Sequence, residues 1–125
     1  MSKHVGCIIN ELEESDIADD DFSLFMILLK IDDSGEVTST ESIEPIGKIG
    51  VDIDSKECLF HIAPCGKPLK ISEAYAEIET IDSRFSLVSV IEKEFDDSSW
   101  VRMDNPVIGF GENVDEKRFF IVCRA

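Results

Sequence analysis

The sequence predicts an α+β fold, a mostly antiparallel β-sheet or half-barrel with one or two short helices. Three observations support this prediction: a long apolar run at Phe22–Ile31, turn signals on both sides of it, and later stretches in which β-branched and polar residues alternate. Only Ser23 and Lys30 interrupt the apolar run, which indicates a strand buried on both faces. A short buried helix fits the same periodicity, but the hairpin context favours the strand.

The chain of 125 residues is expected to form a single domain, residues 1–125, because this length suits one hydrophobic core. Hydrophobic residues make up 43% of the sequence and charged residues 31%, which is a globular composition. The N-terminus lacks the apolar stretch of a signal peptide, and no segment has the apolar length of a membrane span. We therefore expect a cytoplasmic protein without a membrane partner, whose four cysteines are free thiols.

The first third of the chain is predicted to contain three strands. Val5–Ile9 is a short strand, in which Cys7 acts as a small hydrophobe. Residues 10–21 are predicted as a loop or a frayed helix, because seven like charges leave too few apolar residues to pack. Phe22–Ile31 then folds back through an Asp-Asp-Ser-Gly turn onto a polar edge strand, Glu36–Ile43.

Proline and glycine punctuate the middle of the chain. Pro45 and Gly47 are predicted to break it before a strand at Lys48–Ile53. This strand is expected to pair with Cys58–Ala63 in a second hairpin, because only a short turn separates them. Residues 64–68 contain two prolines and a glycine and are predicted as a loop.

The segment Ile71–Ile81 fits two structures. Its apolar residues form a stripe at helical spacing, and Ser72 is a suitable N-cap. Other residues of the same segment alternate as in a strand. We favour the helix and leave the strand open.

The last third is predicted to consist of strands joined by turns. Arg84–Phe95 has apolar residues on both faces, and an acidic turn connects it to an extended segment, Trp100–Met103. Asn105-Pro106 is expected to break this segment. A final hairpin joins Val107–Phe110 to Lys117–Cys123 around a Gly-Glu-Asn turn.

The cysteines and histidines define an alternative chemistry. Cys58, His61 and Cys65 have the ligand types of a zinc site, and Cys65 beside Lys67 suggests a reactive thiol with His61 as its base. Residues three apart in a strand point to opposite faces, so we expect Cys58 to belong to the core and expect no metal and no cofactor. The sequence also lacks the common phosphate-loop, hydrolase and metalloprotease motifs. We therefore expect no catalytic residues and a protein that is not an enzyme.

Charge is the most unusual property of the chain. It has 27 acids and 12 bases, a net charge of −15. Such a surface repels nucleic-acid phosphates and attracts basic proteins, so we expect a basic protein partner and no nucleic acid. The alternative is that the acids only form a solvated face. The single tryptophan, Trp100, is expected either in the interface with the partner or in the core. The candidate partner-binding residues are two acid clusters and this tryptophan: Glu11, Glu13, Glu14, Asp16, Asp19, Asp20, Asp21, Glu92, Glu94, Asp96, Asp97 and Trp100.

Through these acids and Trp100, the chain resembles as a class the bacterial immunity proteins that neutralise cognate toxins, including nuclease toxins of contact-dependent growth inhibition and related systems. The resemblance implies a tight complex with a basic toxin domain, in which the immunity protein blocks the active site or an adjacent surface. Two alternatives are a non-catalytic subunit or adaptor of a larger assembly, and a small metal-binding protein or thiol enzyme that uses the Cys58, His61 and Cys65 set.

Overall fold

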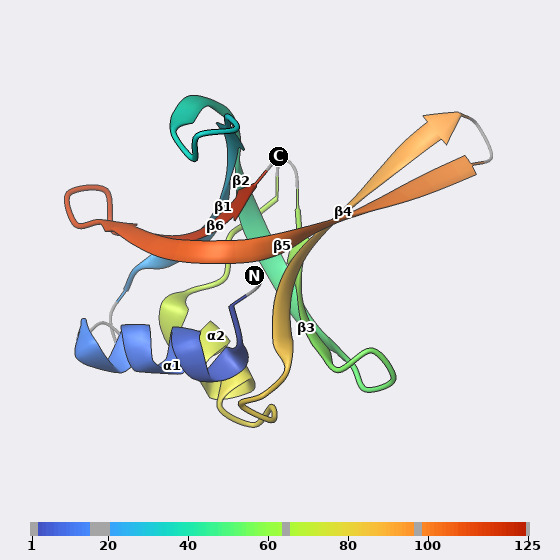
Figure 1. Cartoon of the computed structure of the whole chain (residues 1–125). Helices are drawn as coiled ribbons and strands as arrows, with labels where there is room; N and C mark the ends of the chain where they lie inside the picture. The colour runs from blue at the N-terminus through green and yellow to red at the C-terminus, as the bar shows by residue number, and fades with distance from the viewer. Residues whose placement is uncertain (1–2, 16–20, 64–65, 97–98, 125) are drawn as a thin grey trace.

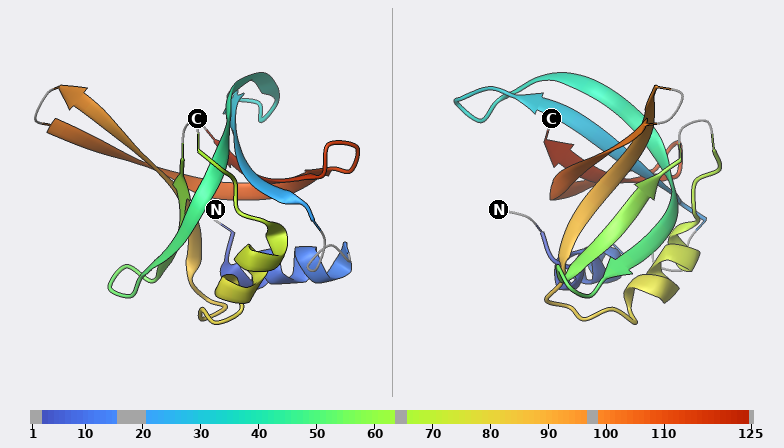
Figure 2. Two further views of the ribbon diagram at one scale, coloured as in Figure 1. Left: turned by 180° about the vertical axis from the view of Figure 1, so that it is seen from behind. Right: turned by 90° about the vertical axis from the view of Figure 1, so that its right-hand side faces the viewer.

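The computed structural model describes residues 3–15, 21–63, 66–96 and 99–124, which form two helices and six strands (Figure 1). The strands close into a barrel in the order β1-β2-β3-β4-β5-β6, with both helices at one end of it (Figure 2). Four neighbouring pairs are antiparallel, and the β1–β6 and β3–β4 pairs are parallel. The predicted α+β class with a mostly antiparallel sheet is confirmed.

The element boundaries are as follows. The helices are α1 (Val5–Glu14) and α2 (Ile71–Ile78). The strands are β1 (Ser23–Ile31), β2 (Val37–Asp52), β3 (Glu57–Ile62), β4 (Ser86–Asp96), β5 (Ser99–Asn113) and β6 (Arg118–Arg124). Neither helix is long and apolar enough to cross a membrane, as far as the described residues extend.

Helix α1 occupies the segment that was predicted as a strand, so that prediction is wrong. Val5, Ile8 and Leu12 are fully buried. Their spacing of three and four residues places them on one face of a helix, whereas a strand would divide them between two faces. The helix continues to Glu14, through acids that we expected in a loop or a frayed helix. Burial of one apolar stripe therefore outweighs the repulsion among these charges.

The N-terminal residues complete the barrel wall before α1 begins. The backbone N–H of Lys3 donates to the carbonyl oxygen of Val107 at 2.8 Å, and the N–H of Leu87 donates to the carbonyl oxygen of Lys3 at 2.8 Å. Lys3 thus lies between β4 and β5 at the point where β5 leaves β4 to pair with β6. This contact anchors the start of α1.

The three predicted hairpins β1–β2, β2–β3 and β5–β6 are confirmed by their strand pairing. Strand β1 differs from the prediction because it buries only one face. Leu24 and Met26 are fully buried, while the residues that alternate with them are half-buried. The turn of the last hairpin lies after Asn113, beyond the predicted Gly-Glu-Asn turn.

Two strands exchange one hydrogen-bonded neighbour for another at a proline residue. Strand β2 pairs with β1 up to Pro45 and with β3 from Ile46, so it is not an edge strand. Strand β5 pairs with β4 up to Pro106 and with β6 from Val107. The predicted breaks at these prolines are therefore wrong: the strands bend and continue. A proline is tolerated there because the strand changes its hydrogen-bonding partner, and a register shift follows each corner.

Helix α2 confirms the helical alternative for its segment, with a different start. Ile71, Ala74 and Ile78 are buried at helical spacing. The N-cap is Lys70 rather than Ser72, and the Lys70 backbone N–H donates to the Glu73 carboxylate at 3.3 Å. One core cluster combines residues of both helices and all six strands.

Strand β4 is confirmed with its two predicted faces. Leu87 and Ile91 join the main core, whereas Val88 and Val90 form a second small cluster with Leu59 of β3. The outer end of the β4–β5 hairpin projects beyond the barrel (Figures 1 and 2).

Candidate functional site

Acidic side chains concentrate on the two helices that close one end of the barrel. We call this surface the acidic helical end. It is defined by Glu11, Glu13, Glu14, Asp21, Glu73, Glu77 and Glu79. Neither helix contains a lysine, arginine or histidine, and the nearby Lys70 forms an ion pair with Asp21 at 3.4 Å.

A side-chain hydrogen bond joins the two helices at this surface. The hydroxyl group of Tyr75 in α2 donates to the carboxylate of Glu13 in α1 at 2.9 Å. The two helices therefore contact each other at this surface. Burial raises the pKa of the Cys58 thiol in the core, and the negative charge of Glu77 in α2 adds to this effect.

Several of these acids occupy positions that a helix disfavours. Glu13 and Glu14 lie in the last turn of α1, Glu77 lies in the last turn of α2, and Glu79 is its C-cap. A helix C-terminus carries a partial negative charge, so an acid there typically costs a few tenths of a kcal/mol at low salt. No basic residue offsets this in either last turn. Helix stability therefore does not explain why acids are found here.

The second predicted acid cluster lies elsewhere. Glu92, Glu94 and Asp96 belong to β4 and Trp100 to β5, in the hairpin that projects beyond the barrel (Figure 1). The Glu94 backbone pairs with that of Trp100. In both views of Figure 2 this hairpin points away from the helices, so the two predicted clusters do not form one continuous surface. Asp16, Asp19, Asp20 and Asp97 lie outside the described residues.

The side chain of Cys58 is part of the core, as expected. Cys58 is fully buried with Phe60 and Ile62 on the inner face of β3. His61 occupies an alternate position on the strand and lies over Gly50 of β2, where an added Cβ would approach its Nε2 to 3.0 Å. Cys58 and His61 therefore face opposite sides of the strand and do not converge on a shared metal. Cys65 lies outside the described residues.

The buried thiols are poorly suited to nucleophilic chemistry. Burial raises the pKa of Cys58 to about 12, and the Glu77 carboxylate adds to this effect. Burial also raises the pKa of Cys123 to about 11, although a hydrogen bond with Ser89 partly opposes the shift. A thiol reacts as its thiolate, so both groups are almost entirely unreactive near neutral pH.

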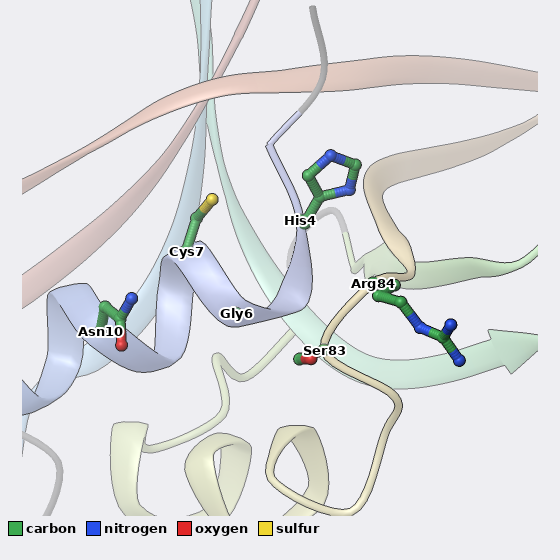
Figure 3. Close-up of a pocket in the computed structure, with 6 residues that line it drawn as sticks. All are labelled: His4, Gly6, Cys7, Asn10, Ser83 and Arg84. Atoms are coloured by element: carbon green, nitrogen blue, oxygen red, sulfur yellow. The ribbon is translucent and has the colours of Figure 1, made fainter.

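A shallow hollow of about 320 Å³ lies where α1 meets the segment before β4 (Figure 3). It is lined by His4, Gly6, Cys7, Asn10, Ser83 and Arg84. The N–H groups of Val5 and Gly6, which open the helix, already donate to backbone carbonyls of the segment before β4 at 2.9 Å.

The side chains around this hollow diverge. The guanidinium of Arg84 donates to the Asp82 carboxylate through two hydrogen bonds of 3.1 and 2.8 Å. Figure 3 shows Cys7 and Arg84 pointing away from each other. The described residues also contain no group of three or more His, Cys, Asp or Glu side chains arranged to hold a metal ion. The hollow therefore does not assemble a reactive set.

The outer side of β2, β1 and β6 carries an apolar surface that the sequence reasoning missed. On β1 and β6, half-buried apolar residues alternate with fully buried ones. Strand pairing places the outward-facing residues side by side. We call this surface the apolar outer face, and it consists of Phe25, Ile27, Leu29, Ile43, Pro45, Phe120 and Val122. The signal in the sequence was the lack of polar alternation in Phe22–Ile31, which we assigned to burial on both faces.

Aromatic and basic side chains contact one another on this face. The rings of Phe25 and Phe120 are tilted, with centroids 6.3 Å apart. The Arg118 guanidinium lies 4.5 Å from the centroid of the Phe25 ring, within range of a cation–π contact. Arg118 also lies 3.8 Å from the Glu116 carboxylate.

Comparison with known proteins yields no relative: no protein-family model, curated protein or solved structure matches this chain.

Proposed function

We propose that this chain is an acidic inhibitor of the immunity-protein type, which binds and neutralises a basic toxin domain of the nuclease class. The observation that carries the proposal is the acidic helical end. All its carboxylates except that of Asp21 come from the two helices and the C-cap of α2, and four of them lie at helix ends that disfavour negative charge. A basic partner supplies a reason for their presence that helix stability does not.

The chemistry of a nuclease complements this surface. A nuclease needs positive charge to bind the phosphates of its substrate. An acidic inhibitor with a net charge of −15 is attracted to that same region, and its field speeds the encounter of the two proteins. Bound there, the inhibitor excludes the substrate.

The test uses the product of the reading frame directly upstream of this gene as the probe. We expect a tight complex that suppresses nuclease activity. Its association rate, measured by stopped flow, should fall at least about tenfold as salt is raised from about 0.01 M to about 0.15 M, because the Debye length falls from about 30 Å to about 8 Å. A partner that binds equally fast at both salt concentrations would contradict the proposal.

Matched charge variants locate the binding surface. Replacing Glu11, Glu13 and Glu14 by glutamine should slow association and reduce its salt dependence. The control replaces Asp33, Asp54 and Asp115 by asparagine, which removes the same charge from three exposed hairpin turns. If both triple variants slow association equally, net charge acts alone and the acidic helical end is not the site.

Trp100→Ala tests the second predicted cluster separately. A buried aromatic anchor acts mainly on dissociation, so its loss should shorten the lifetime of the complex about thirtyfold, equivalent to about 2 kcal/mol. An unchanged dissociation rate would remove the β4–β5 hairpin from the interface.

The apolar outer face favours a second candidate function, a non-catalytic subunit or adaptor of a larger assembly. Contiguous apolar surfaces on soluble proteins often mark protein interfaces. In that case the acids keep the chain soluble. Stable co-purification through the apolar outer face, unaffected by the triple glutamine variant, would support this function over inhibition.

A further inference from the structure

The apolar outer face contrasts with the charge of the rest of the chain. The outward-facing positions of β6 carry Arg118 and Arg124, and those of β1 carry no acid. The chain as a whole has 27 acids and 12 bases. Arg118 is paired with Glu116 at 3.8 Å, so this face is close to neutral on a strongly acidic molecule.

The face is also open along its border with β5. Strand pairing places Gly111 opposite Phe120 and Gly109 opposite Val122. A Cβ added to either glycine would meet no atom within 4 Å. At these two positions the outer side of β5 therefore presents only backbone beside the apolar side chains. Another sheet can approach this surface at the usual spacing of about 10 Å.

We propose that a second copy of this chain covers the apolar outer face, sheet against sheet, in a weak symmetric dimer. Charge supports this occupant. Two copies with a net charge of −15 repel each other, and the repulsion is smallest where the facing surfaces are apolar and carry little net charge. A two-fold arrangement uses the same face on both copies and closes without growing into a filament.

The size of the face indicates how stable the dimer is. The three strands of the face and the adjoining β5, spaced about 4.8 Å apart, together with about 23 Å of β6 give a contact area of about 19 by 23 Å. Both copies together bury roughly 900 Å², which is near the lower limit for a specific interface. The dimer is therefore reversible and dissociates on dilution.

The test is the molar mass in solution, measured by sedimentation between about 10 μM and about 1 mM chain, the range suited to a weak interface. The mass should rise towards that of two chains with concentration. It should also rise with salt, because screening weakens the repulsion between the copies. Higher salt should thus strengthen self-association, whereas it should slow association with the basic partner. Either proposal can therefore fail without the other.

Two variants of β2 provide a matched pair. Ile43 and Val51 are both 45% exposed, but only Ile43 belongs to the apolar outer face. Ile43→Glu should weaken self-association at least about tenfold, and Val51→Glu, with the same change of charge, should leave it nearly unchanged. Gly111→Gln offers a second disruption that removes no native contact.

Three results would overturn the proposal. The first is a chain that stays monomeric throughout the range of protein concentration, both at about 0.01 M salt and at about 0.15 M salt. The second is an equal effect of Ile43→Glu and Val51→Glu, with folding confirmed by circular dichroism. The third is binding of a single-stranded DNA probe to this face that is lost in the Phe120→Ala variant. Aromatic and arginine side chains on a sheet also suit base stacking.

Discussion

At the scale of single residues, Asp82 and Arg84 form the best-defined charged contact among the described residues. The Arg84 guanidinium and backbone N–H donate to the Asp82 carboxylate and lower its pKa from 3.8 to about 2. Because the folded state favours the ionised form, this contact stabilises the fold above about pH 4 and loses its effect as the pH falls through about 2.

An NMR titration of the carboxyl groups tests this pair. Arg84→Gln should move the Asp82 midpoint back towards 3.8. The carboxyl group of Asp32 provides an internal control, because its pKa is lowered by the hydroxyl of Ser34 and the N–H of Glu36. An unchanged Asp82 midpoint in the variant would show that Arg84 does not cause the shift.

The thiols make a second prediction at this scale. Folding keeps Cys58 and Cys123 neutral, so their contribution to stability is present below about pH 9 and is lost as the pH rises through about 12 and 11. At pH 8, iodoacetamide should label half-buried Cys7 in the folded protein and should reach Cys58 and Cys123 only on unfolding. Peptide mass spectrometry with and without urea measures this. Equal labelling of Cys58 and Cys7 in the folded state would contradict it.

At the scale of elements, the two strand corners make different demands on their glycines. A Cβ on Gly47 would lie 2.8 Å from the Cβ of Ala63, whereas a Cβ on Gly109 would meet nothing within 4 Å. We expect Gly47→Ala to reduce the free energy of unfolding by about 1–3 kcal/mol. Gly109→Ala should change it by less than about 1 kcal/mol. Urea denaturation measures both, and equal losses would mean that the corner itself, rather than the clash, requires glycine.

At the scale of the whole molecule, the net charge of −15 should limit stability at low salt. Raising the salt concentration from about 0.01 M to about 0.15 M should raise the melting temperature, because it screens repulsion among the acids. Replacing Glu13, Glu14, Glu77 and Glu79 by glutamine should raise it by about 2–6 °C at low salt and by less at high salt. Calorimetry tests both, and a melting temperature that ignores salt would show that the charges are too well solvated to matter.

Local patterns were sufficient for the hairpins, for α2 and for the fold class. The segment around the Asp-Asp-Ser-Gly turn alternates and reverses within a few residues, so the information needed for pairing is local. The helical stripe of α2 was also visible in the sequence. Of the acidic helical end, the sequence analysis named the acids of α1 and Asp21. It missed Glu73, Glu77 and Glu79 in and beside α2, because nothing local in the sequence brings α2 next to α1.

Tertiary structure decided the rest. Val5–Ile9 is apolar enough for a strand, and it becomes a helix because Val5, Ile8 and Leu12 together cover the end of the barrel. Pro45 and Pro106 are breakers in an isolated strand, yet each is accommodated where a strand exchanges one neighbour for another. The apolar run of β1 and the hairpin signals beside it were enough to predict a strand there. Only closure of the barrel decided that one of its faces enters the core and the other remains at the surface, because burial depends on neighbours that lie far away in the sequence.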